Sequence, residues 1–225
     1  ASANRAFRFP TYTDLYYTTT ESHTSDPNLK PEYATTFEAG ANFSRGALQI
    51  NSALYYRFGK GMIDWIRPFA TAENPRPKWQ SAHADINAMG GDIQAQYAFS
   101  NCFLRKVQLS YSGGTQDRKE IEGYDSRYAM DYLKHKIVFG LHHNIYKRLN
   151  VSWNALWQDR NGSYALNNEK RYYEAFLVLD ARLQWENEPV RVFVDFNNIF
   201  DRQYADFGGI IQAGRWIRTG IRLQL

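Results

Sequence analysis

The chain lacks the features that mark several large classes of protein. Its 225 residues include one cysteine, Cys102, so an intrachain disulfide is excluded and we interpret this residue as a small packed side chain. No run of 18 or more residues is apolar and the mean hydropathy is −0.59, which excludes membrane-spanning helices. The net charge is only +4, and the lysines and arginines are scattered, so no basic stripe for nucleic acid is predicted.

Motifs for catalysis or cofactor binding are also missing. The sequence contains no Gly-x-Ser-x-Gly, no phosphate-binding loop and no Cys-x-x-Cys. His142 and His143 are neighbours in a predicted strand, so they point to opposite faces and do not chelate one metal. His83 and Asp85 share a face but have no evident third ligand. We therefore predict no catalytic residue, no metal site and no cofactor, while a barrel hydrolase with a Ser/His/Asn or Asp/His set stays open as an alternative.

What the sequence does have is many aromatic residues, 16% of the chain, and a two-residue alternation of apolar and polar side chains. The clearest apolar face is formed by Leu149, Val151, Trp153, Ala155 and Trp157. About ten strands of this kind are predicted. They lie at residues 5–10, 33–43, 47–66, 79–99, 105–114, 134–145, 149–158, 172–185, 190–200 and 215–225.

The connections between these strands alternate between short and long. Short turns fall near residues 45, 101, 147 and 187, and long loops fall near 20, 72, 122, 165 and 207. Many strands exceed ten residues, which suits a tilted crossing of a bilayer better than an ordinary globular sheet. We predict an all-β fold, an antiparallel transmembrane β-barrel with tight periplasmic turns and long extracellular loops. The alternative is a β-sandwich whose core contains the aromatic residues.

The last strand, residues 215–225, defines the sidedness. Its odd positions from Ile217 to Leu225 are apolar or threonine, whereas Arg218, Gly220, Arg222 and Gln224 occupy the other face. A barrel strand has this pattern when its apolar face meets lipid. With the turn at 186–189 in the periplasm, the loops at 201–212 and 11–30 are extracellular. The aromatic residues predicted to face outward are Tyr56, Phe58, Tyr97, Phe99, Trp153, Trp157 and Trp185.

Four motifs occur in a fixed order along the chain. They are RFPTYTDLY at 8–16, NLKPE at 28–32 with TFEAG at 36–40, NNIFDRQY at 197–204 and GRW at 214–216. Together they resemble the C-terminal part of the barrel of TonB-dependent outer-membrane receptors. Their physical role is structural. Pro31 suits a strand entrance, and Asn197 and Asn198 suit a turn.

The resemblance implies a protein larger than this chain. The family has a 22-stranded barrel, an N-terminal plug and a segment that engages TonB. We expect residues 1–225 to be the C-terminal part of such a barrel, as a fragment or processed product without plug and first strands; the alternative is that about ten strands close into a smaller barrel. The implied location is the outer membrane of a Gram-negative bacterium.

The implied function of the whole protein is active import of a scarce solute. The solute would be an iron chelate, cobalamin or a glycan, and TonB would supply energy through the missing N-terminal part. The expected partners are outer-membrane lipid, a small solute at the extracellular loops and TonB, with no nucleic acid. The alternative is a small self-contained barrel that acts as a passive pore, an adhesin or a membrane hydrolase.

Candidate solute-binding residues lie where the predicted long loops meet the strands. Aromatic and arginine side chains at a barrel mouth hold ligands by stacking and charge. The alternative role for each is packing in an aromatic girdle or within a loop. The candidates are Tyr12, Tyr16, Tyr17, Trp65, Arg67, Trp79, Tyr164, Arg171 and Tyr172.

Overall fold

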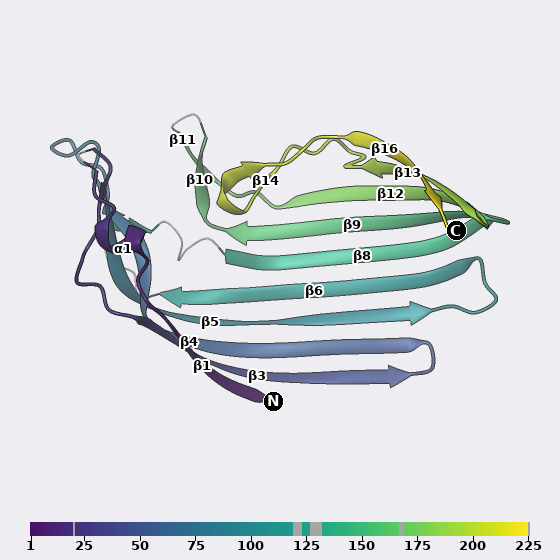
Figure 1. Cartoon of the computed structure of the whole chain (residues 1–225), viewed down its shortest axis with the longest axis horizontal. Helices are drawn as coiled ribbons and strands as arrows, with labels where there is room; N and C mark the ends of the chain where they lie inside the picture. Colours follow the sequence, from purple (N-terminus) through teal and green to yellow (C-terminus); the bar gives the residue numbers. More distant parts are fainter. Residues whose placement is uncertain (20, 119–122, 127–131, 167–168, 225) are drawn as a thin grey trace. The chain divides into compact units, whose positions relative to one another are not determined.

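The computed structural model describes all residues except 20, 119–122, 127–131, 167–168 and 225. Its main strands are β1 (Ser2–Arg8), β3 (Glu32–Arg45), β4 (Leu48–Pro68), β5 (Trp79–Ala98), β6 (Leu104–Arg118), β8 (Tyr132–Tyr146), β9 (Leu149–Asn161), β12 (Phe176–Asn187), β13 (Val190–Asn197) and β16 (Trp216–Leu223). They are hydrogen-bonded in the order β1-β3-β4-β5-β6-β8-β9-β12-β13-β16 (Figure 1). These ten strands confirm the predicted number, and an order with two end strands suits part of a larger barrel.

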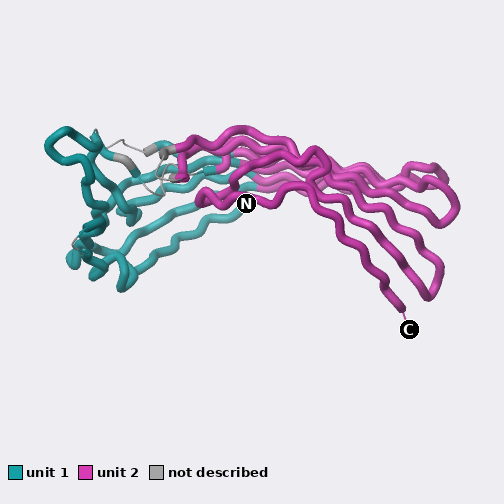
Figure 2. The backbone as a smooth tube through the Cα atoms, turned by 90° about the horizontal axis from the view of Figure 1, so that it is seen from above, with its two compact units in different colours: residues 1–39, 54–90, 114–132 teal, residues 40–53, 91–113, 133–225 magenta. Residues whose placement is uncertain are grey.

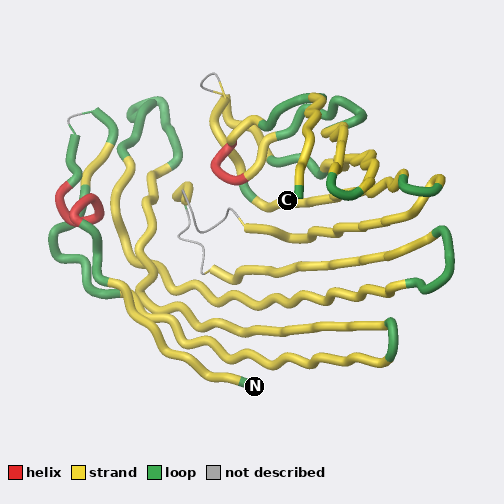
Figure 3. The backbone as a smooth tube through the Cα atoms, turned by 45° about the vertical axis from the view of Figure 1, so that its right-hand side comes forward, coloured by secondary structure: helices red, strands yellow, loops and turns green. Residues whose placement is uncertain are grey.

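Shorter elements occupy the predicted long loops. They are α1 (Tyr12–Tyr16), β2 (His23–Thr24), β7 (Tyr124–Ser126), β10 (Ser163–Leu166), β11 (Glu169–Tyr172), β14 (Ala205–Asp206), the 3-10 helix η1 (Phe207–Gly209) and β15 (Ile210–Ile211). β2 pairs with β5 and β7 with β4, while β10–β11 and β14–β15 are separate two-stranded pairs. Figure 3 shows the helical segments in red between strands. Among the described residues, no helix has the length and apolar character needed to cross a membrane.

Several predicted strand ends are corrected by the structure. The strand predicted for 105–114 continues to Arg118, and the one predicted for 172–185 begins only at Phe176 because Tyr172 ends β11. The first strand ends at Arg8 rather than at residue 10, and the last at Leu223, with residue 225 outside the described residues. Beyond the lipid both faces of a strand meet water, so backbone pairing continues there without an alternating sequence pattern.

The chain forms two compact units (Figure 2). Unit 1 comprises residues 1–39, 54–90 and 114–132, and unit 2 comprises residues 40–53, 91–113 and 133–225. Unit 1 contains a small buried apolar cluster of Ala84 and Ile86, with Met62 packed against it. Unit 2 contains the regular antiparallel ladder from β9 through β12 and β13 to β16.

The exposed faces of the strands separate the barrel prediction from the sandwich alternative. A sandwich would bury the aromatic residues, yet Phe58 is 49% exposed in unit 1 and Tyr97 is 43% exposed in unit 2. In β16, Ile217, Ile221 and Leu223 are 60%, 71% and 63% exposed. Lipid, rather than a protein core, is the medium that suits such a face.

Candidate functional site

A capping box begins the helix in the first long loop. The Oγ1 of Thr11 accepts a hydrogen bond from the backbone N–H of Asp14 (3.2 Å), and Asp14 Oδ2 accepts from the backbone N–H (2.9 Å) and hydroxyl (2.8 Å) of Thr11. Burial alone would raise the pKa of Asp14, but these bonds and the charge of Arg8 lower the pKa below its usual value. The carboxylate is therefore charged and held at the N-terminus of α1.

Arg8 and Glu32 connect this helix to the strands of unit 1. Arg8 Nε donates to Glu32 Oε1 (2.7 Å) and Nη2 donates to Oε2 (3.1 Å), while Nη1 lies 3.3 Å from Asp14 Oδ2. Glu32 Oε2 also accepts from the backbone N–H of Ile63 (2.8 Å). The polar residues of the first two motifs thus have the structural role that the sequence predicted.

β5 contributes a second set of contacts to the loops. The N–H of Lys30 donates to Nε2 of His83 (3.0 Å), so the ring proton is on Nδ1, which donates to the carbonyl of Gly61 (2.7 Å). Asp85 Oδ1 accepts from the N–H of Gly61 (2.8 Å). His83 and Asp85 therefore hold backbone segments. Among the residues that the structure describes, no group of three His, Cys, Asp or Glu side chains could hold a metal ion.

Five rings gather at the first loop of unit 1. Tyr17 and Trp65 each lie close to His23, with both centroid distances 5.2 Å, and Tyr12 and Tyr16 lie 5.0 Å apart on α1. Tyr12 is 79% exposed, whereas Trp65 is 6% exposed. Trp65 thus packs beneath the loop, and the tyrosines of α1 are the ones open to a solute. His23 was not among the residues selected from the sequence.

Arg67 and Trp79 line a cavity of about 400 Å³ in unit 1. The guanidinium carbon of Arg67 lies 4.5 Å from the centroid of the Trp79 ring, which is a cation–π contact. Glu21, Ser22 and Arg76 also line the cavity. Its volume is in the range of small-molecule sites, and its walls offer one aromatic face, two positive charges and the negative charge of Glu21.

The three remaining candidates lie in unit 2 on the β10–β11 hairpin. Tyr164 pairs with Arg171, and the Tyr164 ring lies 5.1 Å from the ring of Tyr173. The N–H of Gly209 in η1 donates to the Tyr173 hydroxyl (3.0 Å). The hairpin therefore packs on the loop before β16, and Tyr172 at its end is 70% exposed.

Charged and aromatic residues that were not selected from the sequence contact the loop before β16. Arg160 Nη2 lies 3.3 Å from Asp206 Oδ1, and the rings of Phe176 and Tyr204 stack at 4.2 Å. Burial, followed by nearby carboxylates, raises the pKa of Tyr204. The sequence feature that could have identified Tyr204 is its position at the end of the third motif, residues 197–204.

A charged row crosses the polar face of β12, β13 and β16. Asp195 Oδ1 accepts from Arg182 Nε (2.5 Å) and Oδ2 accepts from Arg182 Nη2 (2.9 Å). Arg218 donates to Oδ2 through Nε (2.9 Å) and Nη2 (2.7 Å). The register pairs all three residues directly across the strands, on the face opposite to the apolar one.

Each unit thus brings together its own sequence-predicted candidates. Unit 1 groups Tyr17 with Trp65 and Arg67 with Trp79, and unit 2 groups Tyr164 with Arg171. These groups offer stacking faces and guanidinium charges, which suit non-covalent binding. Their contact with a solute stays a prediction.

Comparison with known proteins adds independent findings. The family model "TonB dependent receptor-like, beta-barrel" matches residues 1–199. The vitamin B12 transporter BtuB of Vibrio vulnificus (strain YJ016) is 25% identical over 216 residues, which cover 91% of this chain and 30% of BtuB. The chain therefore spans less than a third of that relative.

Solved structures agree on the fold. The copper transporter OprC superposes with a TM-score of 0.72 at 17% identity, covering 97% of this chain and 37% of OprC. The ferripyoverdine receptor of the outer membrane of Pseudomonas aeruginosa gives a TM-score of 0.68 at 14% identity, covering 98% of this chain and 30% of the receptor. The FrpB iron transporter from Neisseria meningitidis also gives 0.68, at 17% identity, covering 97% and 36%.

Proposed function

The chain belongs to the TonB-dependent receptor-like β-barrel family, and we propose that it forms the C-terminal part of the barrel of a receptor that imports a scarce solute. The observation that carries the proposal is the family match over residues 1–199. The protein is located in the outer membrane of a Gram-negative bacterium, and its relatives are transporters and receptors. Energy would come from TonB, through a part of the protein outside these residues.

Within the whole receptor, this chain would supply barrel wall and solute-facing loops. The exposed apolar side chains of the strands would face outer-membrane lipid. The cavity beside Arg67 and Trp79 would contact the solute by charge and stacking. Binding and release need no covalent step, so we propose no enzymatic activity, no cofactor and no nucleic-acid partner.

The solute class is an iron chelate, cobalamin or a glycan. The relative that is named a vitamin B12 transporter makes cobalamin the first solute to test, at 25% identity. Ferric siderophores come next, because solved neighbours are named for iron and ferripyoverdine.

The test is uptake by cells in which the gene for the whole receptor is deleted and then restored. Radiolabelled cyanocobalamin, several ferric siderophores and labelled oligosaccharides would be supplied, in strains with and without functional TonB. We expect the restored gene to give uptake of one solute, and only when TonB is present. Uptake that is equal without TonB would point to a passive pore, and no uptake of any solute would reject the import proposal.

A binding measurement tests the loop residues separately. Arg67→Gln with Trp79→Leu removes the charge and the stacking face, and we expect about tenfold weaker solute binding by the purified receptor. The matched control is Arg45→Gln, at the tight turn after β3. Equal affinities for the two variants would remove this cavity from the solute site.

A further inference from the structure

The start of β5 holds the loop segment 21–31 within unit 1. The backbone N–H of Trp79 donates to the carbonyl of Ser22 (2.9 Å), and the hydroxyl of Ser81 accepts from the N–H of Asp26 (2.8 Å). Ser22 and Trp79 both line the cavity of about 400 Å³ described above. The segment therefore forms part of the cavity wall, and its position depends on its contacts with β5.

His83 makes the third contact, two residues after Ser81 and on the same face of β5. Its Nε2 accepts from the N–H of Lys30 (3.0 Å), and its Nδ1 donates to the carbonyl of Gly61 (2.7 Å). Gly61 has a φ of +61°, and its N–H donates to Asp85 Oδ1 (2.8 Å). The ring of His83 thus joins the loop segment to an irregular point in the backbone of β4.

The contact of His83 responds to protons, whereas that of Ser81 does not. A hydroxyl oxygen accepts at any ordinary pH, but an imidazole that gains a proton becomes a donor at both nitrogens. Nε2 would then face the N–H of Lys30 donor to donor, and the hydrogen bond between them would be lost. Histidine is the side chain whose charge ordinarily changes between pH 5 and pH 8. Lys30 is therefore held only while His83 is neutral.

The charges around this contact are balanced. The charged residues within two positions of His83, Lys30 or Gly61 are Lys30, Glu32, Lys60 and Asp85. The other neighbour of β5 is β6, which ends on Asp117 and Arg118. Three of these six side chains are positive and three are negative, so the surroundings carry no net charge that would by itself fix the ring in one form. The segment contains one further histidine, His23, whose Nδ1 lies 2.8 Å from Ser22 Oγ.

We propose that neutral His83 is a positioning residue for the cavity, because its hold on Lys30 keeps Glu21 and Ser22 on the cavity wall. The three contacts fall at residues 22, 26 and 30, so the loss of one leaves a longer free segment for the others to hold. A proton on His83 therefore loosens the wall. The inference rests on the proposed function only in taking this cavity as the solute site.

Amide hydrogen exchange of the whole receptor in detergent, at pH 7.5 and pH 5.5 and corrected for intrinsic rates, tests the proposal. The N–H of Lys30 reports the contact with His83, and the N–H of Trp79 reports the cavity wall because it donates to Ser22. At the lower pH we expect opening to increase about tenfold at Lys30 and about threefold at Trp79. No increase at Lys30 would reject the proton response, and an increase at Lys30 alone would show that His83 does not position the wall.

His83→Gln is the conservative variant. Glutamine offers an acceptor oxygen and a donor amide but does not titrate, so both contacts can form and the pH response should disappear. His23→Gln is the matched control and should keep the response. A response that is lost in His23→Gln and kept in His83→Gln would assign the proton to His23 and overturn the proposal. His83→Asn takes the place of His83→Gln if the latter lacks the heat-modifiable gel mobility of a folded barrel.

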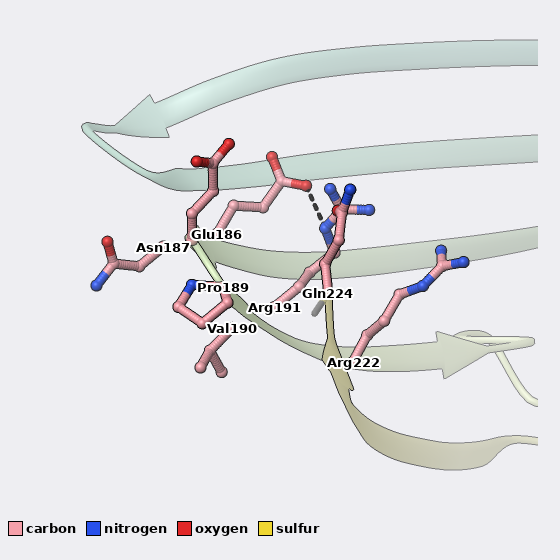
Figure 4. Close-up of a pocket in the computed structure, with 8 residues that line it drawn as sticks. Glu186, Asn187, Pro189, Val190, Arg191, Arg222 and Gln224 are labelled. Carbon is pink, nitrogen blue, oxygen red and sulfur yellow. Dashed lines mark ion pairs between the residues drawn. The ribbon is translucent and has the colours of Figure 1, made fainter.

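The turn between β12 and β13 in unit 2 supplies a reference without histidine. Figure 4 shows Glu186 paired with Arg191 beside a cavity of about 460 Å³, and none of the eight described residues that line this cavity is a histidine. The N–H of Glu186 donates to the carbonyl of Arg148 (3.1 Å). Its corrected exchange should be equal at the two pH values. An equal rise there would show a general loss of stability and would overturn the assignment to His83.

The exchange experiment uses no solute. Failure of the uptake experiment together with the expected pH response would reject import and keep the positioning role of His83. TonB-dependent uptake without the pH response would keep import and reject that role.

Discussion

In unit 1 the carboxylates of Asp14 and Glu32 accept hydrogen bonds from the backbone N–H groups of Thr11 and Ile63, whereas in unit 2 Asp195 accepts from the guanidiniums of Arg182 and Arg218. The first arrangement holds the N-terminus of α1 and one N–H of β4. The second links side chains across strands whose backbone is already paired in a ladder. A carboxylate therefore holds local backbone in unit 1, and in unit 2 it balances the charge of two arginines on neighbouring strands.

The comparison indicates which part of the structure should be destabilised when each carboxylate is removed. Removal of Glu32 leaves the half-buried N–H of Ile63 without its acceptor, which costs more than an unmade surface contact. Removal of Asp195 leaves the ladder intact but places two cations next to each other. The first change should open the backbone locally around β4, and the second should lower the stability of the whole sheet.

The largest expected effect is that of Glu32→Gln. The variant loses the charge that Arg8 contacts at 2.7 Å and weakens the acceptor of Ile63. We expect local opening to become about 2 kcal/mol easier, with roughly thirtyfold faster amide exchange at Ile63. Hydrogen-exchange mass spectrometry on the receptor in detergent measures this. Glu38→Gln, an exposed residue of the same strand, should leave the exchange unchanged, and equal effects would break the comparison.

Asp195→Asn comes next. With the carboxylate gone, the guanidiniums of Arg182 and Arg218 repel each other on one face. We expect the free energy of unfolding to fall by about 1.5 kcal/mol, with partial recovery at high salt. Urea unfolding in detergent, followed by tryptophan fluorescence, is the measurement. Adding Arg218→Gln should recover part of the loss; no recovery would argue against charge repulsion as the cause.

A pair of glycines in one loop of unit 2 gives a smaller effect. Gly208 and Gly209 both have positive φ, +71° and +72°, but only at Gly209 would a Cβ meet Tyr164, at 2.6 Å from its Cβ. Gly209→Ala should therefore loosen the β10–β11 hairpin by about 1 kcal/mol more than Gly208→Ala does. The rate of trypsin cleavage after Arg171 reports the loosening. Identical rates would show that the hairpin does not pack on this loop.

The smallest effect is the pH response of α1. Because the pKa of Asp14 is lowered from its usual 3.8, its contribution to stability is complete above that value and is lost as pH falls through the lowered pKa. We expect the opening of α1 to increase as the pH falls below 3.8, by less than in Glu32→Gln. Intrinsic-rate-corrected amide exchange measures it. Asp14→Asn should remove the response, and a variant that keeps it would assign the titration to another group.

Most of the sheet was predictable because lipid imposes alternation on the sequence. Every predicted strand has a counterpart, and Trp153, Ile217, Ile221 and Leu223 are exposed as expected for a face that meets lipid, whereas Val151 is buried. The strand ends were not predictable to the same degree. β6 continues to Arg118 and β9 to Asn161, where both faces are polar and the alternation is lost.

The loops were predicted as places for binding but not as structures. Helix α1 has five residues, too few for a helical period, although the Thr11–Asp14 spacing of a capping box was present. Trp65 was selected from the sequence as a residue at the barrel mouth, but its side chain is only 6% exposed. Whether an aromatic residue at a strand end is covered depends on a segment distant in the sequence, here the one that contains His23.

The sequence by itself determined the class of fold, the number of long strands and which face of each strand meets lipid, because alternation is a local property of successive residues. Only the tertiary structure decided that Arg8 meets Glu32 and that Asp195 lies between two arginines. Such partners depend on strand register and on loop paths between residues far apart in the chain. A two-residue period cannot encode either of them.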